Sequence, residues 1–185
     1  MIEKHFHIHL FLSFLKAIAL STLSIACFLF LLKIWIVSFD RVAGNSMVPT
    51  MRTNNLFMVN KLTYIARKPM RGDIAQIIEP TRKSFVIKRI IGLPGEKISF
   101  KEGNVYINDV KLNEPYLREN TPTFYNKKAD FVSFTIPKNK YFVIGDNRMF
   151  SVDSRNYGFV DRLNITGRVS AQHDPSQQKI TLLHP

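Results

Sequence analysis

Cysteine is almost absent from this sequence: the single one, Cys27, lies inside a long apolar run. A single cysteine excludes an intrachain disulfide and any metal site built from several thiolates. Histidine is also scarce after residue 40, where only His173 and His184 occur, in the polar C-terminal tail. Neither has an acidic partner in an evident motif, so the sequence does not favour a Ser-His-Asp triad.

His5, His7 and His9 alternate just before the apolar run. Residues two apart do not share a face of a helix, so this spacing favours a polar flank over a metal site. We therefore expect a protein that needs no metal and no other cofactor.

Acidic residues are few: 14 Asp and Glu stand against 26 Lys and Arg, and the net charge is +12. Nearly all of this excess lies after residue 40, so that part of the chain would be attracted to anionic lipid headgroups or nucleic acid. The basic residues are scattered, and no helix-turn-helix, RNP-like or zinc-ligand pattern accompanies them. We expect a solvated basic surface and no nucleic-acid partner, and keep a membrane-anchored basic binding protein as the non-catalytic alternative.

Charged side chains are nearly missing from residues 10–39. The charge-free core, residues 17–32, would form a helix of roughly 24 Å at about 1.5 Å per residue. Lys16 and Lys33 bracket this core and can extend toward the two interfaces of a bilayer. No small-x-small cleavage pattern follows the run, so residues 1–39 are predicted to be a retained anchor whose partner is the lipid bilayer. The basic residues on its two flanks do not decide its orientation.

Residues 40–185 predict a mostly β domain, an antiparallel sheet or barrel-like fold that follows the single N-terminal helix. β-Branched and aromatic residues gather in short segments, separated by turn residues such as Pro94-Gly95. Two polar segments, 113–130 and 151–155, are predicted loops, and no amphipathic helix stands out. The expected strands span residues 56–61, 74–78, 84–93, 97–100, 105–108, 110–112, 131–136, 141–144, 165–170 and 180–183.

Ser46 lies in a short segment, residues 43–51, that follows the apolar run directly. Gly44 permits a positive φ, and Pro49 biases Val48 toward extended backbone, so we expect Ser46 on a rigid, extended segment. A serine hydroxyl is neutral at pH 7 and needs a base to become a nucleophile. On this segment alone, a linker next to the membrane is the simpler interpretation.

Lys88 is the best candidate for that base. It lies in an apolar segment, residues 85–92, which should be buried on at least one face. Burial disfavours the ammonium form and lowers a lysine pKa, so a neutral amine could accept the serine proton and later protonate the leaving amine. The alternative is that Lys88 and Arg89 mark an edge or a solvent face of the strand.

A third group of polar residues occupies positions 145–155, after an apolar strand. Asp153 and Arg155 are two residues apart and would share a face of an extended segment. A buried ion-pair network could fix this loop, and Ser151 could hydrogen-bond the neutral amine of Lys88. The alternative is a solvated loop.

These segments, in this order, resemble bacterial type I signal peptidases, the membrane-anchored serine proteases that use a Ser/Lys dyad. The resemblance covers nearly all of the chain after the anchor, and the absence of long insertions resembles the minimal single-span form. The matching segments are Gly-Asn-Ser-Met-Val-Pro-Thr-Met (44–51), Arg-Gly-Asp-Ile (71–74), Lys-Arg-Ile-Ile-Gly-Leu-Pro-Gly-Glu (88–96), Val-Tyr-Ile-Asn (105–108), Asn-Glu-Pro-Tyr-Leu (113–117) and Gly-Asp-Asn-Arg-Met-Phe-Ser-Val-Asp-Ser-Arg (145–155).

The resemblance implies that Ser46 is the nucleophile and that Lys88 is the general base and acid, with Ser151 orienting the Lys88 amine. The Ser46 backbone N–H would hold the oxyanion, and Gly44 stands where some members carry a serine as a second donor. The residues implied to support the site are Asp146, Asn147, Arg148, Asp153 and Arg155, and those implied to line shallow apolar pockets are Met47, Met51, Val86 and Ile87.

The implied activity is an endopeptidase that releases N-terminal signal peptides from exported preproteins after a small-x-small motif. The substrate would bind in extended form beside the strands that flank Ser46 and Lys88. The resemblance places the catalytic domain on the extracytoplasmic face of the bacterial inner membrane. A specialised relative that processes pilins in conjugation systems would share the dyad and the anchor, and is the alternative within this family.

Overall fold

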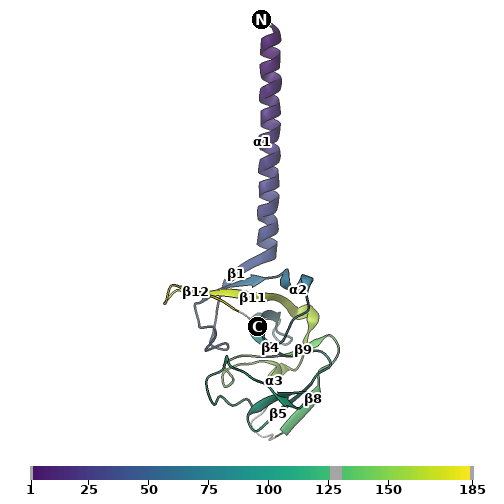
Figure 1. The fold of residues 1–185 in the computed structure, drawn as a ribbon, viewed down its shortest axis with the longest axis vertical. Coiled ribbons are helices and arrows are strands. Elements are labelled where there is room, and N and C mark those ends of the chain that lie inside the picture. The colour runs from purple at the N-terminus through teal and green to yellow at the C-terminus, as the bar shows by residue number, and fades with distance from the viewer. Residues whose placement is uncertain (1, 126–130, 184–185) are drawn as a thin grey trace. The chain divides into compact units, whose positions relative to one another are not determined.

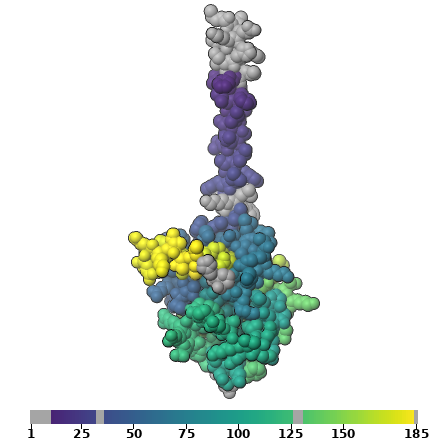
Figure 2. All heavy atoms as spheres, in the orientation of Figure 1, coloured from purple at the N-terminus to yellow at the C-terminus, as the bar shows by residue number. Residues whose placement is uncertain are grey.

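The computed structural model describes residues 2–125 and 131–183 and separates into two compact units, Met1–Val37 and Ser38–Pro185 (Figure 1). The first unit is the helix α1 (Ile2–Ile36). Its stretch Phe11–Leu31 has a mean hydropathy of 2.1 and is long and apolar enough to cross a membrane. Every residue of this stretch is exposed, and Figure 2 shows one face of it as spheres. The helix ends at Ile36, so the last three residues of the predicted anchor belong to a strand instead.

The second unit contains two sheets. The larger has eight strands in the order β1-β2-β11-β3-β4-β9-β10, with β12 also paired to β11, and the smaller has four in the order β7-β6-β5-β8. Every strand pair whose register is described runs antiparallel, so the predicted mostly β fold is confirmed. The strands are β1 (Val37–Arg41), β2 (Leu56–Asn60), β3 (Ile74–Ile78), β4 (Phe85–Gly92), β5 (Lys97–Lys101), β6 (Asn104–Ile107), β7 (Val110–Lys111), β8 (Phe131–Thr135), β9 (Lys140–Ile144), β10 (Val160–Asp161), β11 (Ile165–Asp174) and β12 (Lys179–Leu182).

Strand β4 carries Lys88, and only part of this strand has neighbours on both sides. Residues 85–89 pair with β3, whereas β9 pairs with β4 only from Arg89 onward. Within the described residues, the edge of 85–88 that faces away from β3 is therefore unpaired. Burial follows the same division, because residues 88–92 are buried and Phe85 is 64% exposed. Lys88 therefore lies where the buried part of β4 meets the part that has one unpaired edge.

Three apolar clusters form the core of this unit. One contains Met47 and Met51, packed on side chains from β2, β3 and β11. The second lies among β3, β4, β9 and β11. The third joins the two sheets through the rings of Phe100, Phe134 and Phe142, whose centroids lie 5.5 to 6.4 Å apart. The first cluster matters most for function, because it ties the segment around Ser46 to the larger sheet.

The loop predicted at residues 151–155 is wrong in its second half, because Ser154 begins a one-turn helix, α3 (Ser154–Tyr157). Asp153 caps this helix. Its side chain accepts a hydrogen bond from the Arg155 N–H, and the Asn156 side chain accepts one from the Asp153 N–H. Such reciprocal capping satisfies backbone donors that would otherwise have no partner.

Other differences lie in short elements. Strands β1 and β10 and the helices α2 (Thr63–Ala66) and η1 (Arg162–Asn164) were not expected, and β11 continues to Asp174 instead of ending near residue 170. These elements are too short for their periodicity to stand out, and pairing with neighbours decides them. Of the predicted loop 113–130, residues 113–125 form neither helix nor strand, and 126–130 lie outside the described residues.

Candidate active site

Ser46 lies in a turn, and the prediction of an extended segment is wrong. The Met51 N–H donates to the Met47 carbonyl at 2.9 Å, which closes one turn of chain after the serine. The turn forms because both methionine side chains point into the same apolar cluster, where they are 1% and 0% exposed. Gly44 enters this turn with a φ of +96°, a conformation that glycine adopts without strain.

Lys88 lies beside the serine, with its Nζ atom 2.9 Å from Ser46 Oγ. The same amine donates to the Ile87 carbonyl oxygen at 3.1 Å. Lys88 is 3% exposed, so the alternative of a solvent-facing lysine is wrong. Burial is the main cause that lowers the pKa of Lys88, while the carboxylate of Asp153 acts in the opposite direction. The neutral amine that a general base requires is therefore reached at a lower pH than for an exposed lysine.

No histidine lines the cavity beside Ser46 in the described part of the chain. His173 lies in β11, opposite Leu56 of β2, and His184 is outside the described residues. The side chains of the early histidines also lie outside the description.

The turn after β9 holds the backbone of Ser46. The Asn147 N–H donates to the Ser46 carbonyl at 3.0 Å, and its side-chain amide donates to the Asn45 carbonyl at 3.0 Å. Gly145 lies against the same carbonyl, because a Cβ built at Gly145 would be 2.5 Å from the Ser46 oxygen. The Ser46 N–H, in contrast, donates to no protein atom within residues 2–125 and 131–183. The Ser46 carbonyl is thus fixed, whereas the Ser46 N–H is left without a protein acceptor among the described residues, as an oxyanion donor would need to be.

Gly145→Ala should lower kcat/KM by about 10²-fold, because the new methyl group would displace Ser46, and small displacements of catalytic groups cost about that much. The added Cβ would overlap Ser151 as well as crowd the Ser46 carbonyl. Gly167→Ala is the matched control, since its Cβ would overlap Val59 in the core of the larger sheet. Both variants should lose about 1–3 kcal/mol of stability, but only Gly145→Ala should slow the folded enzyme. Equal kcat values for the two folded variants would contradict this role.

A buried ion pair links the strand that carries Lys88 to the turn that holds Ser46. The Asp146 carboxylate accepts from Arg89 at 2.7 and 2.8 Å, and from the Thr50 hydroxyl at 2.5 Å. Arg89 also donates to the Gly72 carbonyl at 2.8 Å and lies 3.8 Å from the centre of the Tyr116 ring. Both charged side chains are almost fully buried, so the idea that Arg89 marks a solvent face is wrong.

Two further ion pairs fix the loop at 145–155. The Asp153 carboxylate accepts from the Arg155 guanidinium at 2.8 Å through each oxygen, and also from the Gly145 N–H at 3.0 Å. Arg148 is paired with Glu114 at 2.6 Å and donates to the Gly145 carbonyl at 3.2 Å. Both pairs converge on Gly145, so the residues that the sequence assigned to support do surround the backbone that touches Ser46.

Ser151 does not make the contact expected of it. Its hydroxyl oxygen is buried without a hydrogen-bond partner in the described residues, so the expected bond to Lys88 is not made in this structure. The side chain packs against Gly145 instead, and the Lys88 amine donates to the Ile87 carbonyl.

A cavity of about 240 Å³ opens beside Ser46 and Lys88. Residues 40–43 and residues 85–88 are among those that line it. The four residues assigned to apolar pockets, Met47, Met51, Val86 and Ile87, all line it. Sequence reasoning missed the remaining lining residues, which are Asp40, Arg41, Val42, Ala43, Phe57, Gln76 and Phe85.

A serine beside a buried lysine, with a cavity at an open strand edge, is the arrangement that a serine hydrolase with lysine as its base requires. Residues 15–173 match the model of the family described as signal peptidase, peptidase S26. The chain belongs to this family. It is therefore a serine peptidase of the kind that cleaves signal peptides, and the predicted family and enzyme class are confirmed.

Two signal peptidases of known sequence support this membership over most of their length. Signal peptidase I of Bacillus caldolyticus is 36% identical over 160 residues, which cover 82% of this chain and 87% of the relative. Signal peptidase I V of Bacillus subtilis is 39% identical over 138 residues, which cover 70% and 82%. A crystal structure of a signal peptidase I from Enterococcus faecalis is 36% identical, covers 56% of this chain and 97% of its own, and has a TM-score of 0.49.

Proposed function

We propose that Ser46 and Lys88 form the catalytic dyad of a signal peptidase. Neutral Lys88 takes the hydroxyl proton as Ser46 Oγ attacks the scissile carbonyl carbon, and the oxyanion accepts a hydrogen bond from the Ser46 N–H. Collapse of the resulting tetrahedral intermediate breaks the scissile C–N bond, and the Lys88 ammonium protonates the leaving amine. Water then hydrolyses the ester on Ser46, with Lys88 again as base. The observation that carries this proposal is the 2.9 Å distance between the two side chains, with Lys88 3% exposed.

The substrate is a preprotein whose signal peptide lies in the 240 Å³ cavity. The unpaired edge of residues 85–87 can accept the substrate as an added strand, with backbone hydrogen bonds supplying affinity. Met47, Met51, Val86 and Ile87 surround the side chain next to the cleaved bond. Because Met47 and Met51 are closely packed in the core, that part of the cavity cannot expand, which favours small residues.

We further propose that residues 1–39 anchor the enzyme in the bacterial inner membrane and that residues 40–185 act on its extracytoplasmic side. The apolar stretch Phe11–Leu31 and the family's action on exported proteins support this placement. The orienting role expected of Ser151 stays a prediction. General preprotein processing is preferred over pilin processing, because the chain matches signal peptidase I relatives over most of their length.

The test uses the full chain in detergent with several unrelated preproteins. We expect cleavage after a small-x-small motif, mapped by mass spectrometry of the product N-termini. Acid quenching during turnover should trap an ester between the signal-peptide carboxyl end and Ser46 Oγ. Cleavage of a single pilin-like substrate only would favour the specialised relative. An ester at another residue, or no cleavage of any preprotein, would overturn the proposal.

A further inference from the structure

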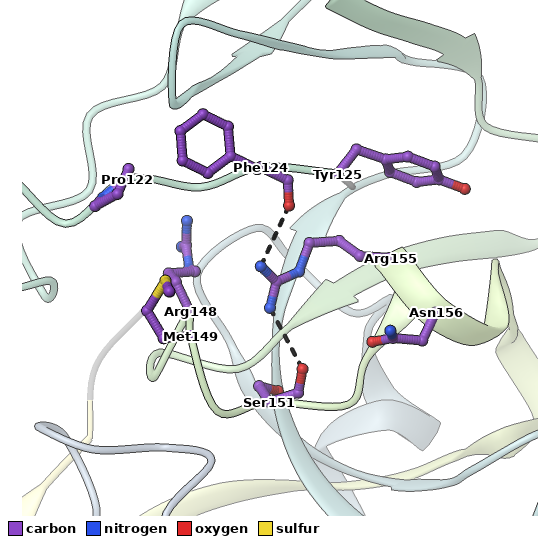
Figure 3. Close-up of a pocket in the computed structure, with 8 residues that line it drawn as sticks. All are labelled: Pro122, Phe124, Tyr125, Arg148, Met149, Ser151, Arg155 and Asn156. Carbon is purple, nitrogen blue, oxygen red and sulfur yellow. Dashed lines mark hydrogen bonds between the residues drawn. The ribbon is translucent and has the colours of Figure 1, made fainter. Parts of the chain in front are cut away.

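The structure contains a second cavity, of about 370 Å³ (Figure 3). One of its lining residues is Ser151, whose side chain packs against Gly145, and Gly145 in turn lies against the Ser46 carbonyl. Figure 3 shows Phe124 and Tyr125 along one wall and Met149 along the opposite one. Only Gly145 therefore separates the Ser151 side chain, which lines this cavity, from the Ser46 carbonyl. No step proposed above uses this cavity.

The walls of this cavity combine apolar surface with one arginine, Arg155, whose guanidinium can donate further hydrogen bonds. Phe124 is 48% exposed and Met149 is 64% exposed, so apolar surface faces solvent beside the active site. The Arg155 side chain is only 8% exposed. Its Nη2 atom donates to the Asp153 carboxylate at 2.8 Å and lies 3.5 Å from the Ser151 carbonyl, whereas its Nη1 atom makes only a long contact, 3.4 Å to the Phe124 carbonyl. The two contacts to carbonyls are the dashed lines in Figure 3. Arg155 thus keeps hydrogen-bonding capacity toward the cavity that a carbonyl oxygen could use.

Arg148, the other arginine of the cavity, is more fully engaged, since four of its five N–H groups have partners. Its guanidinium is engaged by the Glu114 carboxylate, the Thr123 hydroxyl and the Gly145 carbonyl. The positive charges of both arginines are matched by bound carboxylates. The cavity is therefore suited to a neutral chain with carbonyl acceptors and apolar side chains, rather than to a free anion.

We propose that this cavity binds the first residues of the released protein, on the leaving side of the cleaved bond. The inference rests on the proposed function. The 240 Å³ cavity ends at Ser46 and Lys88 and accounts for the acyl side of the substrate. An extended peptide that continues past Ser46 must leave along another surface. The cavity at Ser151 offers apolar contacts from Phe124 and Met149 and a donor, Arg155, for a backbone carbonyl.

The test compares two substrates with the same residues before the cleaved bond. One continues as a peptide of several residues, and the other ends in a fluorogenic aryl amide. For Phe124→Ala, the ratio of kcat/KM for the peptide to that for the aryl amide should fall about tenfold, the usual effect of losing one apolar contact to a substrate. Met149→Ala should shift the ratio in the same direction, which guards against a folding defect in either variant. Phe150→Ala is the control, because Phe150 is 80% exposed and does not line this cavity, and its ratio should not change.

A second measurement uses the acyl-enzyme directly. An added peptide amine can attack the ester carbonyl, so that an amide forms and Ser46 Oγ leaves with a proton. With the wild-type enzyme this aminolysis should saturate with peptide concentration, and Phe124→Ala should weaken the saturation about tenfold. Unchanged ratios and unchanged saturation in both cavity variants would overturn the subsite. Failure of the wild type to cleave either substrate would overturn the proposed function, and the subsite with it.

Discussion

Replacing Lys88 with methionine is expected to abolish cleavage while making the folded protein more stable at neutral pH. Methionine preserves the length and apolar packing of the side chain but removes the amine that lies 2.9 Å from Ser46 Oγ. Without a base the serine keeps its proton, and kcat should fall by about 10⁴-fold, the upper end of what one acid–base group supplies. Ser46→Ala should remove activity to a similar extent, because the two side chains act as one unit.

The gain in stability follows from the burial that makes Lys88 useful as a base. Burial lowers the pKa of Lys88 in the folded protein, whereas in the unfolded chain it is about 10.4. Between these two values the unfolded chain binds one proton more than the folded protein, so the free energy of unfolding rises with pH. The penalty for Lys88 is therefore present at neutral pH and disappears above about pH 10.4. Lys88→Met should raise the free energy of unfolding by about 1 kcal/mol at pH 7, and by less at pH 10.

The measurement is chemical unfolding of the full chain in detergent at both pH values, beside a preprotein cleavage assay. Lys97→Met is a matched control, because Lys97 is 45% exposed and pairs with an exposed aspartate. This control should keep full activity and change stability by less than about 0.5 kcal/mol. Lys88→Met with substantial activity would rule out Lys88 as the base. If Lys88→Met instead lowered the free energy of unfolding equally at both pH values, burial of the Lys88 amine would not destabilise the folded protein.

The pairing of Ser46 with Lys88 was predicted from the resemblance to the family, because each local pattern alone also allowed a linker at Ser46 and a solvent-facing Lys88. Lys88 interrupts an apolar segment that was expected to be buried on at least one face, and the structure buries Lys88, which lowers its pKa. Ser46 was harder. Its proline and glycine indicated a restricted backbone, but the turn depends on where Met47 and Met51 find their apolar partners. Those partners come from β2, β3 and β11, which no local pattern brings to residue 46.

Arg89 shows why the contacts that support the site could not all be predicted from the sequence. It follows Lys88 directly, and adjacent residues of a strand point to opposite faces, so the two side chains have different surroundings. The partner of Arg89 is Asp146, 57 residues later, and the Tyr116 ring also covers the guanidinium. A pair so distant in sequence is set by the register of β4 against β9, which the sequence alone does not give. The same limit applies to Gly145. A side chain is excluded at this position because Ser46 lies against it, and that contact is not visible in the sequence.

Asp146→Ala should be among the most destabilising single changes in the domain, with a loss of about 3–5 kcal/mol. The carboxylate accepts two hydrogen bonds from Arg89 and one from Thr50, and its side chain is fully buried. Alanine would leave the Arg89 guanidinium charged and buried, with the Gly72 carbonyl, the Thr50 hydroxyl at 3.4 Å and the Tyr116 ring beside it but no carboxylate. The cost comes from this uncompensated charge, and a purely apolar pair should largely avoid it.

The double variant Arg89→Met/Asp146→Leu separates charge burial from catalytic positioning. It should recover most of the stability lost in Asp146→Ala, as judged by the midpoint of urea unfolding in detergent. Activity should stay below one tenth of the wild type, because Thr50 would still lack the acceptor that fixes the turn after Ser46. Lys140→Ala is the exposed-pair control and should cost less than about 0.5 kcal/mol. Full recovery of activity together with stability would mean that the ion pair serves folding only, and that Ser46 is positioned by the Asn147 and Gly145 contacts alone.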